Sequence, residues 1–383
     1  MQYVGGNRLE LLRNGEQYFP ALLAAIDAAQ SEVFLESYIY ADDRTGSLVA
    51  DTLARAAARG VRVRLLLDGF GARDFAPRLR RMLEGAGAEV LVYRPKISPW
   101  TLRRSRLRRM HRKLASIDGR VAFVGGINII DDFATPEARL PRYDYAVRIA
   151  GPLATEVRAA AARLWLRVSW AELRRRGRVP PAPPPEAPAG DQRAALVVRD
   201  SLRHRRDIEN AYLHHMGGAR EEIFIACAYF FPGRRFRRAI VAAAARGVRV
   251  RLLLQGMVEY PLVHYASRAL FGALLDAGVE IHEYQRSILH AKVAVFDARV
   301  ACVGSSNIDP FSLLLAREAN VFVDDRSFAE ELRASLEEAM RAGAMPLPPQ
   351  RWQKQHLLLR LRIWILYGIA RLLISAFGLE RYH

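Results

Sequence analysis

A histidine followed two positions later by a lysine occurs twice in the sequence, and the residues after each pair repeat as well. The first set comprises His111, Lys113, Asp118, Gly125, Gly126 and Asn128, and the second comprises His290, Lys292, Asp297, Gly304, Ser305 and Asn307. An imidazole can attack phosphorus or transfer protons, and a lysine ammonium can hold a phosphoryl oxygen as a point charge. A single His-x-Lys pair more often lies on a half-exposed strand without any catalytic role. Two matched sets, in a chain with 58 basic residues of which only four are lysine, predict a site that handles phosphate esters.

The residues that follow each pair suggest separate roles. Residues i and i+2 of a strand share a face, so each histidine should project with its lysine while the residue between them points away. Asn128, Asn307 and Ser305 are candidates for binding phosphate oxygens. Asp118 and Asp297 have the opposite strand parity and begin tight turns, so we interpret them as scaffold residues within the repeated set. The candidate catalytic set as a whole is His111, Lys113, Asp118, His290, Lys292 and Asp297.

Two carboxylates could orient the histidines. Glu318 and Asp144 begin matching strands, EANVFV and DYAVRI, and a carboxylate that accepts from imidazole Nδ1–H leaves Nε2 free to attack. The separation between His111 and Asp144 exceeds that between His290 and Glu318 by five residues, which weakens the match for Asp144. The alternative for either carboxylate is an ion pair with one of the many arginines.

The repeat extends far beyond these residues. AAARGVRVRLLL occurs at 56–67 and again at 243–254, which is 187 positions later. Upstream, EVFLESYIY matches EIFIACAYF, and downstream, AGAEVLVY matches AGVEIHEY. Each copy predicts a buried strand, an alanine-rich helix ended by glycine, a β-branched strand, another helix, and two strands around a turn. This alternation predicts an α/β fold with a sheet covered on both faces.

The chain divides into two lobes and two further segments. We expect lobe 1 over 1–178, a proline-rich linker over 179–190, lobe 2 over 191–345, and a C-terminal segment over 352–383. The two cysteines, Cys227 and Cys302, lie in apolar runs typical of buried strands, which excludes a disulfide framework and fits a reducing compartment. The N-terminal residues lack a basic stretch followed by an apolar one, so neither a secretion signal nor an N-terminal membrane span is expected.

The formal net charge of +18 predicts a polyanionic partner, either nucleic acid or an anionic membrane surface. Most of the excess lies in 94–110, a basic insertion of lobe 1 directly before His111, and in 351–383. As a helix, 357–379 would place Arg360 and Arg371 on one stripe and Leu and Ile over most of the remainder, with Arg362 as the exception. This is the pattern of a helix in a membrane interface. A core-packed helix or a membrane span are alternatives for this segment, and a solvated loop is the alternative for the insertion. The expected membrane contacts are Trp100, Arg103, Arg104, Arg106, Arg108, Arg109, Arg360, Trp364 and Arg371.

The doubled motif resembles that of the phospholipase D superfamily, and the resemblance covers nearly the whole chain, from Leu9 to about Gly343. Within that superfamily, NGEQYFPALLAAIDAA, MHRKLASIDGRVAFVGGIN and SSNIDPFSL are similar to bacterial cardiolipin synthases of the short type that lack N-terminal transmembrane helices. The resemblance implies two similar α/β/α lobes that form a pseudo-dimer with one shared active site. It also implies a covalent phosphohistidine and no metal or other cofactor. Gly126 stands where the second copy has Ser305, so the two halves are not chemically symmetric.

The implied activity is transfer of a phosphatidyl group between two phosphatidylglycerol molecules, which gives cardiolipin and glycerol. His111 would attack phosphorus and His290 would transfer protons, an assignment that follows the commoner family pattern and could be reversed. The expected partner is a membrane rich in phosphatidylglycerol rather than nucleic acid. The expected location is the cytoplasmic face of a bacterial inner membrane, peripheral or monotopic. The alternative function is a phospholipase D-type phosphodiesterase that hydrolyses phospholipid or nucleic acid, and the sequence leaves the lipids and the oligomeric state open.

Overall fold

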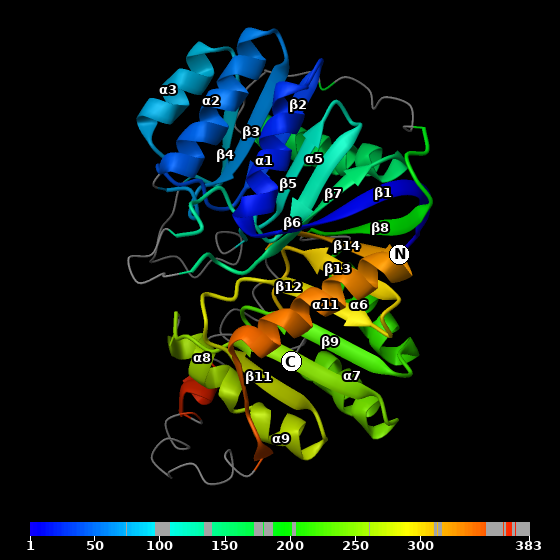
Figure 1. The fold of residues 1–383 in the computed structure, drawn as a ribbon. Helices are drawn as coiled ribbons and strands as arrows, with labels where there is room; N and C mark the ends of the chain where they lie inside the picture. The colour runs from blue at the N-terminus through cyan, green and yellow to red at the C-terminus, as the bar shows by residue number, and fades with distance from the viewer. Residues whose placement is uncertain are drawn as a thin grey trace.

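The computed structural model describes residues 1–73, 75–95, 108–133, 140–171, 179, 187–200, 204–259, 261–309, 312, 316–349, 363, 365–369 and 372. Within these residues the chain forms two lobes that lie one above the other in Figure 1. The linker residues 180–186, most of the basic insertion (96–107) and most of the C-terminal segment lie outside the described residues.

Lobe 1 is built from strands and helices in alternation. Its elements are β1 (Val4–Arg13), α1 (Asn14–Asp27), β2 (Glu32–Ser37), α2 (Arg44–Ala58), β3 (Arg62–Asp68), α3 (Pro77–Gly85), β4 (Glu89–Tyr93), β5 (Lys113–Ile117), β6 (Val121–Gly125), β7 (Tyr145–Ala150) and α5 (Pro152–Ala171). The strand β2 is buried at every residue, as expected for a strand covered on both faces. The side chain of Asp43 caps α2 by accepting from Gly46 N–H, which fixes where this helix begins.

Lobe 2 repeats this order. Its elements are β8 (Gln192–Arg199), α6 (Asp207–Gly218), β9 (Glu222–Cys227), α7 (Arg234–Ala245), β10 (Arg249–Gln255), α8 (Pro261–Arg268), α9 (Phe271–Asp276), β11 (Glu280–Tyr284), β12 (Lys292–Phe296), β13 (Val300–Gly304), β14 (Glu318–Asp324), α11 (Arg326–Gly343) and β15 (Ala344–Pro346). The expected order is incomplete in both copies, because β4 and β11 form a further strand between the second helix and the β-hairpin. Both strands are short and lie parallel to their neighbour, outside the central part of the sheet.

The described strands join into one sheet, whose order is β15-β11-β10-β9-β12-β13-β14-β8-β1-β7-β6-β5-β2-β3-β4. Apart from β15, this order reads the same in both lobes when it is followed outwards from the β1–β8 junction. The two lobes are therefore related as in a pseudo-dimer. The strand β6 also contacts β13 and β14 without pairing with them, so the two halves of the sheet approach each other face to face near the junction.

Three apolar cores stabilise this arrangement. One lies beneath α1, α2 and α3 of lobe 1, and a second lies beneath α6, α7 and α9 of lobe 2. The third is shared between the lobes, and it includes Trp165 of α5, Leu336 of α11, Tyr145 and Val321. The helix α11 lies over the strands of lobe 2 in Figure 1, with one end near the boundary between the lobes. It contacts β1 of lobe 1 as well as strands of its own lobe. Because the third core draws residues from both halves, burial of apolar surface holds the two lobes together.

Candidate active site

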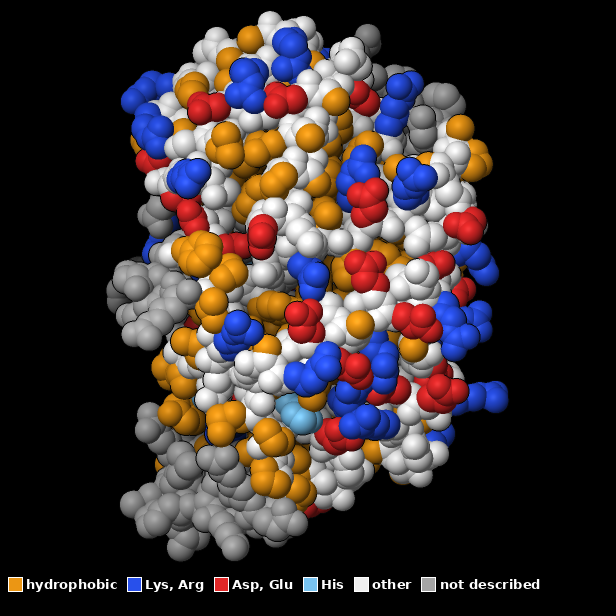
Figure 2. All heavy atoms as spheres, viewed as in Figure 1, with side chains coloured by type: hydrophobic (Ala, Val, Ile, Leu, Met, Phe, Trp, Pro, Cys, Tyr) orange, Lys and Arg blue, Asp and Glu red, His pale blue; other side chains and the backbone are white. Residues whose placement is uncertain are grey.

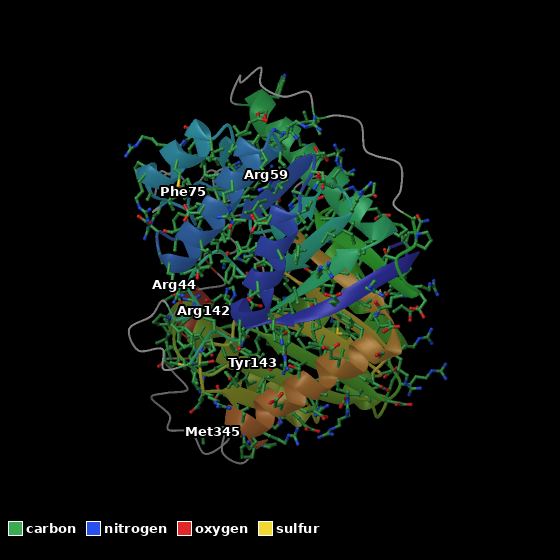
Figure 3. All side chains as sticks on the ribbon, turned by 45° about the horizontal axis from the view of Figure 1, so that its top comes forward. Arg44, Arg59, Phe75, Arg142, Tyr143 and Met345 are labelled. Carbon is green, nitrogen blue, oxygen red and sulfur yellow. The ribbon has the colours of Figure 1, made fainter. Side chains whose placement is uncertain are left out.

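The segments that carry the two histidines are held by backbone hydrogen bonds from the opposite lobe. His111 N–H donates at 3.0 Å to the carbonyl oxygen of Arg317, the residue before Glu318. His290 N–H donates at 2.9 Å to the carbonyl oxygen of Tyr143, the residue before Asp144. Tyr143 lies between the lobes in Figure 3, and its hydroxyl contacts Ser335 of α11. Each histidine therefore lies beside the carboxylate of the other copy, although each His–Lys motif lies within a single copy.

The side chains complete the exchange. His111 Nδ1 lies 2.9 Å and 3.1 Å from the two carboxylate oxygens of Glu318, and His290 Nδ1 lies 2.5 Å from Asp144 Oδ2. Glu318 and Asp144 are buried. An Nδ1–H that donates to a carboxylate leaves the Nε2 of the same ring as the nitrogen with a free lone pair. In the sequence, each histidine is matched with the carboxylate of its own copy, His111 with Asp144 and His290 with Glu318. In the structure, each histidine pairs with the carboxylate of the other copy.

Both lysines are buried directly behind their histidines. Lys113 Nζ donates to His111 O at 2.8 Å; Lys292 Nζ donates to His290 O and lies 3.6 Å from Asp144 Oδ2. The strands β5 and β12 begin at these lysines, so each histidine is the last residue but one before its strand. The residue between them in lobe 1, Arg112, points away to a bidentate ion pair with Glu36, at 2.6 and 2.8 Å. The site thus places two imidazoles, two lysine side chains and two carboxylates in a largely buried space.

Burial and the neighbouring charges shift the pKa values of these groups. Burial, followed by the Lys292 cation, lowers the pKa of His290 to about 3, and burial also lowers the pKa of His111. Burial lowers the pKa of Lys113 to about 7 and lowers that of Lys292. Burial alone would raise the pKa of Asp144, but Lys292 and His290 hold it below its usual range. At neutral pH both imidazoles of the ligand-free protein are therefore neutral, the form in which Nε2 can attack phosphorus.

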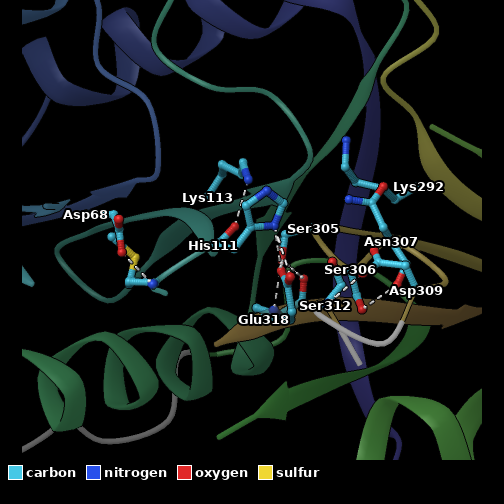
Figure 4. Close-up of polar contacts among 12 residues, drawn as sticks. Asp68, His111, Lys113, Lys292, Ser305, Ser306, Asn307, Asp309, Ser312 and Glu318 are labelled. Atoms are coloured by element: carbon cyan, nitrogen blue, oxygen red, sulfur yellow. Dashed lines mark hydrogen bonds and ion pairs between the residues drawn. The ribbon is translucent and has the colours of Figure 1, made fainter. Parts of the chain in front are cut away.

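The three candidate phosphate-binding residues differ in their contacts. The Ser305 hydroxyl donates to Glu318 Oε2 and accepts from Ala319 N–H, so it is directed at the carboxylate. At the equivalent position of lobe 1, a Cβ on Gly126 would overlap the Asp144 carboxylate, which explains why glycine stands there. Asn128 Oδ1 accepts from Ile39 N–H at 3.1 Å, while the buried Asn307 Oδ1 has no partner among the described residues. Figure 4 shows Asn307 and Ser306 to the right of Ser305 and below Lys292.

The two repeated aspartates lie at the turns β5–β6 and β12–β13. Asp118 has a φ of 55°, and its carboxylate accepts from the backbone N–H groups of Gln30, Ser31 and Glu32. Asp297 has a φ of 53° and accepts from the equivalent residues Arg220, Glu221 and Glu222. These contacts tie each turn to the start of the neighbouring strand, β2 or β9. Neither carboxylate contacts the histidines in the described structure.

The expected membrane contacts fall mainly outside the described residues. These are Trp100, Arg103, Arg104, Arg106, Arg360, Trp364 and Arg371. Arg108 is partly buried. Arg109 is turned inward, with Nη1 3.3 Å from Asp68 and only 16% of its side chain exposed, so its position does not match the expected exposed contact. In the C-terminal segment, residues 363, 365–369 and 372 are helical, and Tyr367 packs on Phe231 with 5.9 Å between ring centroids.

Other residues next to the motifs have no counterpart in the sequence-based predictions. Tyr38 packs edge-on against His111 with 4.8 Å between ring centroids. The buried Asp68 accepts from Met110 N–H at 2.7 Å and so holds the segment that precedes His111 (Figure 4). Both residues directly follow or end a repeated strand, and a comparison of the aligned copies at these positions is the signal that could have found them. No group of three or more potential metal ligands occurs among the residues that the structure describes.

A duplicated α/β lobe with one His–Lys pair per copy and a site built across the copies defines the phospholipase D-like class of proteins. A family model described as "Cardiolipin synthase, PLD-like domain" matches residues 22–165 and 212–340. The chain belongs to this family. It is 40% identical to cardiolipin synthase B of Escherichia coli over 362 residues, which is 91% of this chain and 85% of that protein. It is 30% identical to cardiolipin synthase 1 of Bacillus cereus over 337 residues, which is 86% of this chain and 65% of that protein.

Solved structures share the fold at much lower sequence identity. The crystal structure of phosphatidylserine synthase from Haemophilus influenzae superposes with a TM-score of 0.69 at 14% identity, covering 97% of this chain and 94% of that chain. Polyphosphate kinase from Porphyromonas gingivalis has a TM-score of 0.60 at 15% identity, covering 90% of this chain and 49% of that chain. These two likenesses concern the fold alone.

Proposed function

We propose that this protein is a cardiolipin synthase-type phosphatidyltransferase that converts two molecules of phosphatidylglycerol into cardiolipin and glycerol through a covalent phosphohistidine. The single observation that supports the mechanism best is the exchanged pairing of His111 with Glu318 and of His290 with Asp144. This pairing directs both Nε2 atoms away from their carboxylates. Membership in the cardiolipin synthase family supports the choice of substrate class.

In the first step, His111 Nε2 forms a bond to the phosphorus of phosphatidylglycerol while the bond from phosphorus to the glycerol oxygen breaks. His290 gives a proton to the departing oxygen. In the second step, the head-group hydroxyl of another phosphatidylglycerol loses its proton to His290. Its oxygen then bonds to phosphorus as the His111–phosphorus bond breaks. One diester is exchanged for another, so the reaction balances without a nucleotide.

Charge in the site supports this sequence of steps. The neutral His111 is ready to attack, and Lys113 and Lys292 would stabilise the negative charge that develops on the phosphoryl oxygens. His290 must bind a proton before it can donate one. A phosphodiester anion beside it would oppose the lowering of its pKa by burial and by the Lys292 charge. Asn128 and Asn307 are further candidates for contact with these oxygens. Ser305 would act through Glu318 as a positioning residue, because its hydroxyl is occupied by that carboxylate.

Exposed apolar side chains suggest how the site reaches its lipids. Phe70 and Val258 lie two and three residues beyond the carboxyl ends of β3 and β10 and are 44% and 48% exposed. In the C-terminal helix, Ile365, Ile369 and Leu372 are exposed at helical spacing. Figure 2 shows hydrophobic side chains gathered along one edge, beside atoms that are not described, while basic and acidic side chains mix over the rest of the visible face. Among the described residues, no helix has the length and hydropathy needed to cross a bilayer.

We therefore propose that this edge and the C-terminal helix bind the cytoplasmic face of the membrane peripherally or monotopically. Apolar side chains would enter the head-group region, and arginines would contact anionic phosphatidylglycerol, each contributing about 1 kcal/mol. The membrane then supplies both substrates to one site.

The activity is tested with purified protein and vesicles of phosphatidylglycerol, with products resolved by mass spectrometry. Cardiolipin and glycerol are expected in equal amounts. Phosphatidic acid as the main product would indicate a phospholipase instead, and cleavage of single-stranded DNA in a parallel reaction would indicate a nuclease.

The roles of the histidines are tested with a soluble phosphodiester that carries a nitrophenol leaving group, which departs without a proton. His290→Ala should release a stoichiometric burst of nitrophenol and retain the phosphoryl group on His111, because the first step no longer needs an acid but the second needs a base. His111→Ala should give no burst. The inverse pattern, with the phosphoryl group on His290, would exchange the two roles.

The membrane contact is tested by replacing Ile365, Ile369 and Leu372 together with serine. Loss of three apolar side chains from the interface should weaken binding to phosphatidylglycerol vesicles on the order of tenfold or more. Cleavage of the soluble nitrophenyl substrate should not change. The matched control is Trp170→Ser, which removes an exposed apolar side chain from α5, and it should bind vesicles like the unaltered protein. Equal binding by the triple variant would refute the helix's part.

A further inference from the structure

The two copies differ at the residue that follows the first repeated strand. Tyr38 of lobe 1 aligns with Ala228 of lobe 2 in EVFLESYIY and EIFIACAYF. The Tyr38 ring packs against His111, and Lys113 Nζ lies 5.3 Å from its centroid. Ala228 has no ring to place at the corresponding position, and it instead lines a small cavity. The Tyr38 ring therefore fills the space beside His111, while the equivalent space in lobe 2, beside Ala228, is open.

A second difference lies at the end of the next strand. Asp68 of lobe 1 aligns with Gln255 of lobe 2, each directly after the repeated RVRLLL. Both hold the segment before a histidine: Asp68 accepts from Met110 N–H at 2.7 Å, and Gln255 Oε1 accepts from Leu289 N–H at 3.3 Å. Asp68 also accepts from Phe70 N–H, Gly71 N–H and Arg109.

Gln255 keeps that contact and has an amide nitrogen in addition. Because Leu289 N–H needs an acceptor, the atom that faces it must be Oε1, which places Nε2 on the other side of the amide. Gln255 is only 7% exposed, and its Nε2 is buried without a hydrogen-bond partner among the described residues. A buried donor of this kind is costly unless something accepts from it. Gln255 lines the same cavity as Ala228.

The cavity itself is small and is lined by both polar and apolar side chains. Its volume is about 30 Å³, which is room for roughly two water molecules or one carbon bearing a hydroxyl group. Glu259 lies on its wall and accepts from Tyr229 OH at 2.9 Å. Burial lowers the pKa of the nearby Lys292, and the Glu259 charge opposes this shift in part. A second carboxylate on the wall, Glu283, is paired with Arg268, which also lines the cavity. The cavity therefore offers Gln255 Nε2, a donor without a partner among the described residues, and the Glu259 carboxylate as an acceptor, close to the Lys292 end of the active site.

We propose that this cavity binds a free hydroxyl group of the glycerol head group, with Gln255 Nε2 donating to the hydroxyl oxygen and Glu259 accepting its proton in a hydrogen bond. An alcohol satisfies both walls, because it donates and accepts at one atom. A phosphate oxygen would be repelled by Glu259, and an ammonium group could not accept from Gln255.

The assignment rests on the proposed function and adds a place for the head group. His290, which lies next to Leu289, handles the proton of the alcohol oxygen, so the alcohol belongs on the His290 side and phosphorus between the two histidines. Departing glycerol and the attacking head group must occupy the same place, because the second step reverses the geometry of the first. The filled space beside His111 and the open cavity in lobe 2 agree with His111 as the nucleophile.

The wild-type protein provides the first test. Vesicles of phosphatidylglycerol are incubated with equal concentrations of 1-propanol and either propane-1,2-diol or propane-1,3-diol, and the phosphatidyl alcohols are counted by mass spectrometry. The diol and the monool differ by one hydroxyl group, so their ratio reports only whether the site binds that group. At least one diol should be preferred on the order of tenfold or more, because a buried donor is left unpaired with 1-propanol.

Two variants then assign the preference to the cavity. Gln255→Glu keeps the acceptor for Leu289 N–H and removes the donor, and Gln255→Met removes both. In each, the diol preference should fall at least fivefold while transfer to 1-propanol continues. The matched control is Asp68→Asn at the equivalent position of lobe 1, which should keep the wild-type ratio whatever its rate.

The outcomes separate this proposal from the proposed function. If neither cardiolipin nor a phosphatidyl alcohol is formed, the proposed function itself fails. If cardiolipin is formed but neither diol is accepted, the cavity does not bind a free hydroxyl group and the present proposal is overturned. If 1-propanol and both diols are used equally by the wild-type protein, the cavity holds water only and the present proposal is overturned. A stronger preference for 2-aminoethanol than for either diol would overturn it as well, since the cavity would then bind an ammonium group. A diol preference that survives in a Gln255 variant active with 1-propanol would place the hydroxyl elsewhere.

Discussion

The four chemical residues His111, Lys113, His290 and Lys292 are recognisable from the sequence because each type is needed twice at the same spacing. The carboxylates that pair with the histidines are harder to predict from the sequence. A carboxylate can be predicted near a histidine from strand matching, but which of Glu318 and Asp144 meets which ring depends on how two lobes dock. That information lies in contacts between residues more than a hundred positions apart, such as His111 with Glu318.

The role of Ser305 shows the same limit. A serine after a glycine at the end of a strand is a reasonable phosphate ligand in isolation. In the fold, Gly304 ends β13 beside β14, and the Ser305 hydroxyl meets the Glu318 carboxylate instead. The residue type predicts whether a side chain can donate or accept a hydrogen bond, and the packing of the fold determines which partner it has.

At this scale we predict a pH dependence of stability that originates in His290. Its pKa is about 3 in the folded protein against about 6.5 in an unfolded chain. Between these values the unfolded state binds more protons, so the stabilisation is complete above about pH 6.5 and is lost as the pH falls. From pH 7 to 4.5 this one residue should remove about 2–3 kcal/mol from the free energy of unfolding. Urea unfolding of the wild-type protein at the two pH values measures the loss.

His290→Gln is the comparison for that measurement. Glutamine can still donate to Asp144 but does not titrate, so the variant should lose less stability over the same pH range. Identical losses in the two proteins would mean that the low pKa of His290 does not contribute to acid unfolding.

Among the elements, the repeated strands and helices follow directly from the alternation of apolar runs and alanine-rich segments. The turns also follow, because Asp118 and Asp297 are identified as scaffold residues by strand parity, and the structure places both in turns with a left-handed backbone. The strands β4 and β11 are recognisable as matching segments, yet their place in the element order is missed. Each has only five residues, EVLVY and EIHEY, and so short a segment does not by itself distinguish a strand from the end of a helix.

The turn aspartates give a prediction about the hairpins. Asp297→Ala removes an acceptor for three backbone N–H groups at the start of β9, and it should lower the free energy of unfolding by about 2–3 kcal/mol. The nitrophenol burst from folded protein should remain, because the carboxylate does not contact the reacting groups. Urea unfolding and burst amplitude are measured together.

Asp276→Ala is the control, since this aspartate is exposed at the end of α9. It should change stability by no more than a few tenths of a kcal/mol. A folded Asp297→Ala protein with no burst would assign the aspartate a direct part in the chemistry.

For the whole molecule, the duplication predicts two similar lobes, and the structure adds how they join. The strand β1 pairs with β8 in an irregular register, and the central apolar core takes residues from α5 and α11 together. Neither feature has a sequence signal, because an apolar residue at a lobe boundary looks like any other core residue. These contacts between described residues join the lobes, so we expect them to stay associated without a covalent connection through 179–190.

This leads to a prediction about an interrupted chain. A protease site placed within 180–186 and cleaved after folding should leave the two fragments associated and active, because the shared core and the β1–β8 pairing remain. Gel filtration and the vesicle assay before and after cleavage provide the measurement. Separation of the fragments without denaturant would show that the linker is needed for association.

The exchanged pairing has a consequence for the origin of the molecule. An ancestor with a single copy of the unit would have had a histidine and a carboxylate that could not meet each other within one polypeptide. Two identical chains related by a twofold axis would have formed both pairs at once, so activity can precede gene fusion. Fusion would then have released the halves from symmetry, and changes such as tyrosine to alanine at one of two equivalent positions became possible without altering the other.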